Sequence, residues 1–339
     1  MPELTVRPPD PNPEASSLEV LARVGTAKLE AMGIDWRPIA AAHGLDFSEE
    51  MVEGRRIPTH REHAFLAEAA KAAGDPLFSW RLADMSIKDF GLVGYAILNS
   101  PTVGDALTTM GALMPTVCEA IFFDVMVDGD TASLVYTSSD SRQNGVFAVN
   151  FMVNLLRNVI GPQFAPTRVG LDVTERHNVD VVARQIAGPV TADLPYSFVS
   201  FPGRHLRARV LGADERLAAT LRPYWERQLA QTRRNPTVLR ARIEGAVVQD
   251  LPLGVPNIDR LAAKLNIGRS KLTAELSMIG GYRTVVDDVR RRLAKEMVQR
   301  TDLTMSSIAT HLGFSEPGAL NHAYRRWTGR TPTADRESG

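Results

Sequence analysis

Cysteine is nearly absent from this chain, since Cys118 is the only one among 339 residues. A lone cysteine cannot form an intramolecular disulfide, so the sequence predicts a protein of the reducing cytoplasm. We interpret Cys118 as a small buried apolar residue rather than a redox sensor. No apolar run approaches the ~18 residues needed to cross a membrane, so we expect no membrane contact. Residues 1–15 are rich in proline and lack a basic and then apolar signal, which predicts a disordered tail.

The patterns of known catalytic and metal sites are also missing. His60-x-x-His63 has a helical spacing that suits a metal ion, but no third His or Cys completes a ligand set, which favours a surface helix. Gly91-x-x-Gly94 lacks the Lys-Ser/Thr of a phosphate loop, and the chain has no Gly-x-Ser-x-Gly elbow. The sequence therefore predicts no catalytic residue, no metal site and no cofactor, and a protein that is not an enzyme.

The net charge of the whole chain is zero, but its 39 basic and 39 acidic residues are unevenly distributed along the sequence. Residues 240–339 hold 16 Lys and Arg against 11 Asp and Glu, a net charge of +5, so residues 1–239 carry −5. A basic C-terminal third favours contact with phosphates. Solvated surfaces also vary in charge, so this imbalance alone does not establish nucleic-acid binding.

A helical unit occurs twice in the last hundred residues. The first copy covers 258–272 and the second covers 307–320. The apolar positions Leu261, Ala262, Leu265 and Ile267 of the first copy correspond to Ile308, Ala309, Leu312 and Phe314 of the second. Each copy predicts a short helix, a tight turn and a second helix. This is the layout of a helix-turn-helix, which places its second helix in the DNA major groove.

The segment between the two copies predicts one long amphipathic helix over 282–300. Its apolar residues recur every four positions at Val285, Val289, Leu293 and Met297. A helix of that length spans about 28 Å at 1.5 Å per residue, and B-DNA repeats every ~34 Å. The connector therefore has about the length needed to present two reading helices to successive turns of one duplex.

A long motif in the second copy resembles the AraC/XylS family of transcription regulators. The matching residues are Ile308-Ala309-x-x-Leu312-Gly313-Phe314-Ser315-Glu316-Pro317 and Leu320-x-x-Ala323-Tyr324-x-Arg326-Trp327-x-Gly329-x-Thr331-Pro332. The resemblance covers about residues 240–336. It implies a DNA-binding domain in which the second helix of each copy reads the bases.

Under this resemblance, the exposed positions of the reading helices are the expected DNA contacts. They are Arg269, Ser270, Lys271 and Thr273 in the first copy, and Glu316, Pro317, Gly318, Asn321, His322 and Arg325 in the second copy. On the connector, Arg290 and Arg291 are further candidates for DNA contact, and the alternative is that they form a solvated helix face. Asn321 suits adenine and Arg325 suits a phosphate. His322 stands where the family commonly has arginine. The first copy lacks the family's basic residues at Ala274 and Glu275, so we expect the second copy to supply more of the affinity.

The first two-thirds of the chain predict an α+β domain over 16–232, followed by a linker over 233–239. Helical patterns cover 16–73 in three segments, 99–113, 147–160 and 220–231, and the last of these is a candidate dimer surface. Strand patterns cover 121–127, 131–136, 168–173 and 198–201, with a tight turn at Asp128-Gly129-Asp130 between the first two.

This domain resembles the arabinose-binding-type sensor domain at the front of one AraC-family branch. The matching residues include Ile57-Pro58, Asp75-Pro76-Leu77-Phe78, Gly91-x-x-Gly94-Tyr95 and Asn99-Ser-Pro-Thr102. The resemblance implies a ligand-binding sensor without naming arabinose as the ligand. Candidate pocket walls are Phe90, Tyr95, Phe123, Tyr136 and Phe151, and each of them can also be ordinary core.

Three hypotheses follow from the sequence. The first is a transcription regulator that binds promoter DNA as a homodimer and responds to a small-molecule effector, with RNA polymerase as a candidate partner. The second is an interaction protein whose weakened first copy leaves only non-specific DNA binding. The third is an enzyme with a DNA-binding tail, which requires a titratable cluster in the sensor pocket.

Overall fold

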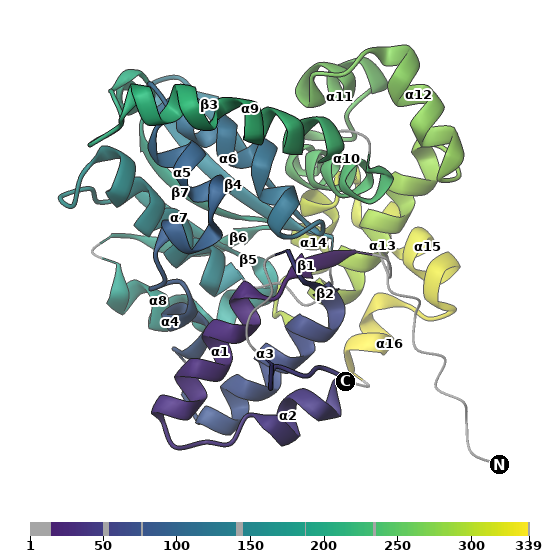
Figure 1. The fold of residues 1–339 in the computed structure, drawn as a ribbon. Helices are drawn as coiled ribbons and strands as arrows, with labels where there is room; N and C mark the ends of the chain where they lie inside the picture. Colours follow the sequence, from purple (N-terminus) through teal and green to yellow (C-terminus); the bar gives the residue numbers. More distant parts are fainter. Residues whose placement is uncertain are drawn as a thin grey trace.

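A computed structural model describes residues 15–49, 54–75, 77–139, 145–186, 188–232 and 235–337. The chain folds into an α+β domain followed by an all-helical domain, which confirms the predicted fold class (Figure 1). The predicted tail lies outside the described residues except for Ala15, which is buried. Arg233 and Arg234 of the predicted linker also lie outside them.

The first elements form a small helical unit beside the main sheet. They are β1 (Ser16–Leu18), α1 (Val20–Ala31), α2 (Arg37–Ala42), β2 (Arg56–Pro58), α3 (Thr59–Ala73) and α4 (Phe78–Leu82). Residues 16–18 were expected to be helical, but they form β1, which pairs antiparallel with β2. Leu29 and Phe65 are fully buried in the core of this unit.

A five-stranded sheet forms the centre of the first domain. Its strands are β3 (Ile121–Asp128), β4 (Thr131–Ser138), β5 (Arg168–Asp172), β6 (Val190–Leu194) and β7 (Ser197–Pro202), in the order β3-β4-β7-β5-β6. The predicted hairpin is confirmed, because Gly129 adopts φ 54° between β3 and β4, a conformation that costs glycine little. β6 was not expected as a regular strand. It pairs in parallel with β5 at the sheet edge.

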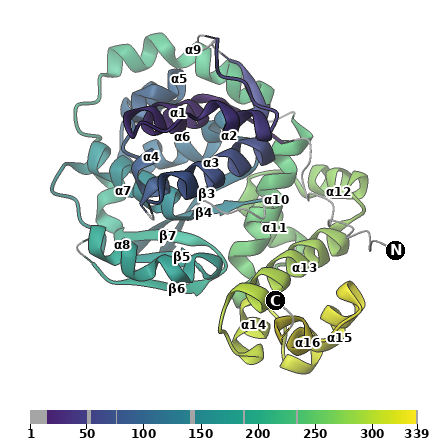
Figure 2. The same ribbon diagram turned by 90° about the horizontal axis from the view of Figure 1, so that it is seen from below.

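Helices cover the first face of this sheet. The helices of this domain after α4 are α5 (Leu92–Leu98), α6 (Val103–Val117), α7 (Gly145–Ile160), α8 (Val179–Gln185) and α9 (Glu215–Thr232). α6 and α7 pack on the sheet, and α9 lies across α5 and α6 (Figures 1 and 2). The strands alternate as expected for a two-faced sheet, since Leu134 and Tyr136 of β4 enter this core and Val135 points to the opposite face.

The second domain packs on that opposite face. It consists of α10 (Pro236–Asp250), α11 (Ile258–Leu265), α12 (Arg269–Met278), α13 (Tyr282–Arg300), α14 (Met305–His311), α15 (Pro317–Thr328) and α16 (Pro332–Glu337). α10 begins inside the segment expected to be a linker, because Asn235 caps it by accepting the backbone N–H of Thr237 at 2.9 Å.

One hydrophobic core joins the two domains. Phe122, Val135 and Phe198 of the sheet belong to the same cluster of buried side chains as Ile243 and Val247 of α10. α10 comes close to the sheet at Gly245, where a methyl group would lie 2.4 Å from Cδ1 of Phe122 and 2.6 Å from Oγ1 of Thr137. The absence of a side chain at residue 245 therefore sets how closely the domains pack.

Polar contacts reinforce this packing at its edges. Arg292 of α13 is only 9% exposed, donates to the carbonyl of Ser138 at 3.4 Å and lies 4.0 Å from the Glu244 carboxylate. Asn235 donates to Oε1 of Glu119 at 2.7 Å. The contacts of Arg292 with Ser138 and of Asn235 with Glu119 tie the helical domain to the first domain. The connector helix is thus held against the first domain on one side.

In the part of the chain that the structure describes, none of the helices is long and apolar enough to cross a bilayer. Nor does that part of the chain bring together three His, Cys, Asp or Glu side chains that could hold a metal ion.

Cys118 is buried, as the sequence predicts. Burial raises the pKa of its thiol to about 12. Since the thiolate is the reactive form, we expect iodoacetamide at mildly alkaline pH to label the native protein on the order of a thousand-fold more slowly than a free thiol. Labelling in denaturant is the control and should be complete. Fast labelling of the native protein would show that the region opens readily.

Candidate nucleic-acid interface

The second helix-turn-helix forms where the sequence predicts it. Thr304 caps α14, because its hydroxyl accepts the backbone N–H of Ser307 at 3.1 Å. Gly313 ends that helix at φ 65°, and a Cβ there would lie 2.5 Å from the carbonyl oxygen of Leu251. Pro317 opens α15, where its missing N–H costs no hydrogen bond. These signals fix the angle between α14 and α15.

The outer face of α15 is open to solvent. Glu316, Pro317, Gly318, Asn321, His322 and Arg325 are all exposed. Leu320, Ala323 and Tyr324 on the other face are buried. The Tyr324 hydroxyl donates to Oδ2 of Asp335 at 2.5 Å, which anchors α16 against the reading helix. All six positions predicted to meet DNA therefore lie on one accessible helix face.

The first helix-turn-helix has the same architecture with weaker signals. Asn257 caps α11 by accepting the backbone N–H of Arg260 at 2.8 Å. The tight turn is made by Asn266, at the position of Gly313, with φ 52°. Asn266 is the one non-glycine residue with positive φ in the described part of the chain, and asparagine tolerates this conformation better than most residues. Gly268 precedes α12 and has no side chain to cap it.

The outer face of α12 is also accessible. Arg269, Ser270, Lys271 and Thr273 are exposed, as predicted. Nη1 of Arg269 lies 2.7 Å from both carboxylate oxygens of Asp259, so part of its charge is already neutralised within the motif. This pairing and the missing cations at Ala274 and Glu275 leave α12 less basic than the family pattern implies.

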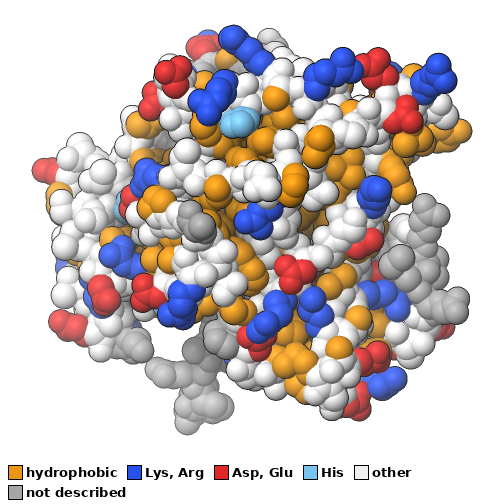
Figure 3. Space-filling view, turned by 90° about the vertical axis from the view of Figure 1, so that its left-hand side faces the viewer, with side chains coloured by type: hydrophobic (Ala, Val, Ile, Leu, Met, Phe, Trp, Pro, Cys, Tyr) orange, Lys and Arg blue, Asp and Glu red, His pale blue; other side chains and the backbone are white. Residues whose placement is uncertain are grey.

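The connector places both reading helices on the same side of the molecule. α13 has 19 residues, and its predicted apolar stripe is buried at Val285, Val289, Leu293 and Met297. Figures 1 and 2 both show α12 and α15 on the side of the molecule away from α5, α7 and α8, with α13 between them. Figure 3 views the opposite side, where positive and negative side chains are interspersed with apolar ones.

Arg290 has a structural role that was not predicted. Its Nε donates to the Leu312 carbonyl at 2.8 Å and its Nη2 donates to the Gly313 carbonyl at 2.6 Å. Its guanidinium carbon lies 4.2 Å from the Phe314 ring centroid, and burial lowers the pKa of the guanidinium. Arg290 therefore holds the turn of the second motif, and we propose this structural role for it ahead of the predicted DNA contact.

The other two connector arginines differ from each other. Arg291 is exposed and pairs with Asp288 at 3.0 Å, so it stays a candidate DNA contact. Arg292 is buried beneath the sensor sheet through the contacts already described. The periodicity of α13 indicates which side is apolar. It cannot show that a second domain covers part of the polar side.

Four of the five predicted ligand-pocket residues come together. Phe90, Phe123, Tyr136 and Phe151 line a cavity of about 50 Å³, together with Glu62, His63 and Cys118. Tyr95 does not line it and is 38% exposed. Because sites for drug-sized ligands usually measure about 300–1,000 Å³, this cavity is too small for such an effector. The aromatic cluster is mainly core, packed ring against ring.

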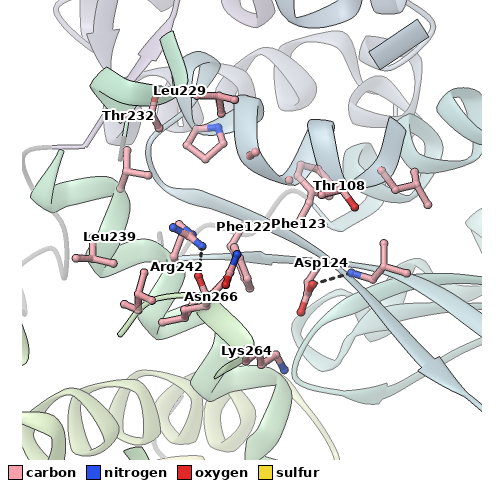
Figure 4. Close-up of a pocket in the computed structure, with 18 of the residues that line it drawn as sticks. Thr108, Phe122, Phe123, Asp124, Leu229, Thr232, Leu239, Arg242, Lys264 and Asn266 are labelled. Atoms are coloured by element: carbon pink, nitrogen blue, oxygen red, sulfur yellow. Dashed lines mark hydrogen bonds between the residues drawn. The ribbon is translucent and has the colours of Figure 1, made fainter. Parts of the chain in front are cut away.

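A much larger cleft lies between the two domains, and sequence analysis did not find it. It measures about 660 Å³ and is lined by residues of α6, β3 and α9 on the sensor side and of α10, α11 and α12 on the DNA-binding side (Figure 4). Its walls come from segments far apart in the chain. No local motif marks such a site, so only the fold could reveal it.

Comparisons with known proteins agree with this architecture. Residues 33–210 match the family model described as the arabinose-binding domain of AraC transcription regulator, N-terminal, and residues 261–338 match a helix-turn-helix domain. The ornithine utilization regulator of Pseudomonas aeruginosa is 26% identical over 288 residues, covering 80% of this chain and 81% of that protein. The transcriptional regulator VirS of Mycobacterium tuberculosis is 27% identical over 308 residues, covering 83% and 87%.

Among solved structures, the transcriptional regulator CdpR from Pseudomonas aeruginosa is similar with a TM-score of 0.46 and 20% identity. That similarity covers 94% of this chain and 98% of that one.

Proposed function

The chain belongs to the AraC transcription regulators with an arabinose-binding-type N-terminal domain, and we propose that it reads two successive major-groove segments of promoter DNA through α12 and α15. The observation that carries this proposal is the shared placement of the two reading helices. Both expose their outer faces on one side of the molecule, joined by a rigid helix of roughly 28 Å. Two such helices fit one face of a duplex.

The roles of the second motif follow from side-chain chemistry. Asn321 can donate to and accept from the adenine edge at once, which gives base discrimination. His322 can donate a single hydrogen bond where arginine would donate two, so its base preference is weaker. Arg325 at the end of the exposed face suits a phosphate. Arg291 on the connector is a further candidate for phosphate contact.

Substitutions at two of these positions should have different effects. Asn321→Ala is expected to lower affinity for the preferred site roughly 5- to 150-fold and to relax selection at one base pair. Arg325→Ala should weaken binding to all sequences similarly and reduce the salt slope by about one unit. Fluorescence anisotropy at several salt concentrations measures both. Lys71→Ala removes an exposed sensor cation and is the control for net charge.

Selection of sheared genomic DNA by the purified full-length protein tests the proposal as a whole. A recovered motif with two half-elements about ten base pairs apart is expected, since each half-element would meet one reading helix. Binding that shows no preferred sequence would instead support the alternative of an interaction protein with weakened DNA binding. In that case the Ala274 and Glu275 departures of α12 are the first positions to restore to arginine.

Regulation by an effector and dimerisation are two further parts of the proposed function. We propose that a small-molecule effector controls how the reading helices are presented, and that two copies bind DNA together as a homodimer. The outer face of α9 supports a dimer contact there, because Tyr224 of this helix is 58% exposed. RNA polymerase is a proposed partner at the promoter. A promoter-binding protein acts where the DNA is, so we propose a cytoplasmic location.

A further inference from the structure

We propose that the cleft between the two domains is the effector site, and that it binds a small zwitterion of amino-acid type with an apolar side chain. The inference rests on the proposed function, because it names the site and ligand class of the effector response. The cleft volume of about 660 Å³ lies within the ~300–1,000 Å³ range of small-molecule sites. It is also more than ten times larger than the cavity enclosed by the sensor's aromatic cluster.

The cleft carries opposite charges on its two sides. Asp124 of β3 is the acidic group on the sensor side, and the DNA-binding side contributes Arg242 and Lys264 (Figure 4). Lys271 also lines the cleft on the DNA-binding side. A ligand that is only an anion would face repulsion from Asp124. A ligand that is only a cation would face three basic side chains. A molecule with an ammonium and a carboxylate a few bonds apart is favourable toward both sides.

Asp124 is built to receive an ammonium group. Its Oδ1 accepts the backbone N–H of Val125 at 2.8 Å, which fixes the carboxylate. No other described side chain forms a hydrogen bond with it. Burial raises the pKa of Asp124, while Lys264 opposes that rise. A partly buried carboxylate without a direct cationic partner is expected to gain more from an incoming ammonium than an exposed one.

The cations opposite are held in different ways. Lys264 is paired with Asp250 at 2.9 Å, and Nη2 of Arg242 donates to the Leu265 carbonyl at 2.8 Å. The planar guanidinium of Arg242 adds positive charge to this wall of the cleft. Lys271 is exposed and forms no ion pair with the described residues. Lys271 is therefore the group that we assign to the ligand carboxylate.

Apolar side chains line much of the rest of the cleft. The contributing side chains are Leu107, Pro115, Phe122, Leu229, Leu239 and Ile267. An unbranched or branched aliphatic side chain would bury its methylenes here, at roughly 0.8 kcal/mol for each one. The polar groups fix the ligand's orientation, and the apolar walls select its side chain.

Ligand binding at this site would act directly on the first reading unit. Asn266 and Gly268, which form the turn before α12, lie in the wall of the cleft. A ligand held between Asp124 and Lys271 would join the sensor strand to the DNA-binding helices. It shifts the equilibrium only if it binds one domain arrangement more tightly than the other. The cleft supplies that difference, because its two halves belong to different domains.

Titration calorimetry on the full-length protein tests the ligand class. The probes are L-norleucine, L-leucine, L-methionine and L-phenylalanine, with hexanoate and pentylamine as norleucine analogues that lack one of its charged groups. We expect at least one amino acid to bind at least ten-fold more tightly than the analogues. No binding of any amino acid at millimolar concentration, or equally tight binding of hexanoate, would overturn the proposal.

A matched pair of variants tests the location. Asp124→Asn keeps the shape of the side chain and is expected to lower amino-acid affinity roughly ten- to a hundred-fold while leaving hexanoate binding no weaker. Asp128→Asn makes the same change at the exposed end of the same strand and should have no effect. Thermal unfolding shows whether both variants fold. Equal affinities in the two variants would place the ligand elsewhere.

DNA binding measured on the same samples separates the site from the proposed regulation. If the protein selects a DNA motif but binds none of the amino acids, the ligand proposal fails and the regulator function stands. If an amino acid binds in an Asp124-dependent way without changing DNA affinity or site spacing, the site stands and the effector role fails.

Discussion

Replacing Gly245 by leucine is expected to force the DNA-binding domain away from the sensor sheet. Even a methyl group at this position would lie 2.4 Å from Cδ1 and 2.9 Å from Cβ of Phe122, and Cβ cannot move without its backbone. Overpacking a dense core costs about 1–3 kcal/mol, occasionally more. Leucine at a contact between rigid elements should reach the upper end, so we expect a loss of ~3 kcal/mol in urea unfolding.

Separation of the domains should also be visible without denaturant. The side chains of Val135, Phe198 and Val247 are buried in the shared core, so undocking would expose apolar surface. We expect stronger binding of a hydrophobic dye, faster proteolysis near α10 and a larger radius of gyration. Gly245→Ala should show a smaller change of the same kind, because its better helix propensity offsets part of the clash.

A second substitution tests whether the clash with Phe122 is the cause. Phe122→Ala alone should cost about 3 kcal/mol through the cavity that it leaves. In the Gly245→Leu background the same change provides room for the new side chain, so the double variant should be more stable than the sum of the single effects predicts. Additive losses would mean that residue 245 acts on α10 alone and does not set the distance between the domains.

The local elements of this chain could be predicted because their signals are local. Alternating residues and the turn at Gly129 specify the β3–β4 hairpin, and Thr304, Gly313 and Pro317 specify where α14 and α15 begin and end. Each of these signals depends on a few neighbouring residues whose backbone preferences agree. The buried and the exposed faces of α12 and α15 could be predicted in the same way, since helical periodicity separates buried from exposed positions.

The arrangement of the domains could not be predicted in this way. Pro236 lies inside the predicted linker, yet it is the first residue of α10. This helix is buried on most sides and therefore lacks the apolar periodicity that marks an amphipathic helix. Residues 190–194 lack a clear strand pattern and become a strand through pairing with β5. The cleft that contains Asp124 and Arg242 exists only because α10 packs on the sheet. Tertiary contacts decide all three cases.

Arg290 shows most clearly how a correct helix assignment can leave the role of a side chain open. The sequence places three arginines in a row on the polar sides of α13, and two of them, Arg290 and Arg291, were predicted to meet DNA. The sequence alone does not show that the carbonyl groups of Leu312 and Gly313 lie directly beside one of these arginines, Arg290. Those carbonyls need a donor because a helix leaves its last carbonyl groups without partners. Arg290 supplies it.

Arg290→Met is therefore expected to destabilise the second helix-turn-helix. It removes two charge-assisted hydrogen bonds and the stacking on Phe314, and such a bond typically contributes about 1.5–3 kcal/mol. We expect a loss of roughly 3 kcal/mol for the DNA-binding domain. DNA affinity should fall for all sequences, and the dependence of affinity on salt concentration should keep its slope, because no phosphate contact is lost. Chemical denaturation and anisotropy titrations measure the two effects.

Two further variants separate a structural role from a phosphate contact. Arg290→Lys keeps the positive charge, but one ammonium cannot reach both carbonyls in the geometry of Nε and Nη2, so it should not restore stability. Arg291→Met removes the exposed neighbour and should change stability by less than about 0.5 kcal/mol. If Arg291 meets a phosphate, its loss reduces the salt slope by about one unit. A reduced slope in Arg290→Met with unchanged stability would instead return Arg290 to the DNA interface, because a residue that holds the turn must affect folding before it affects binding.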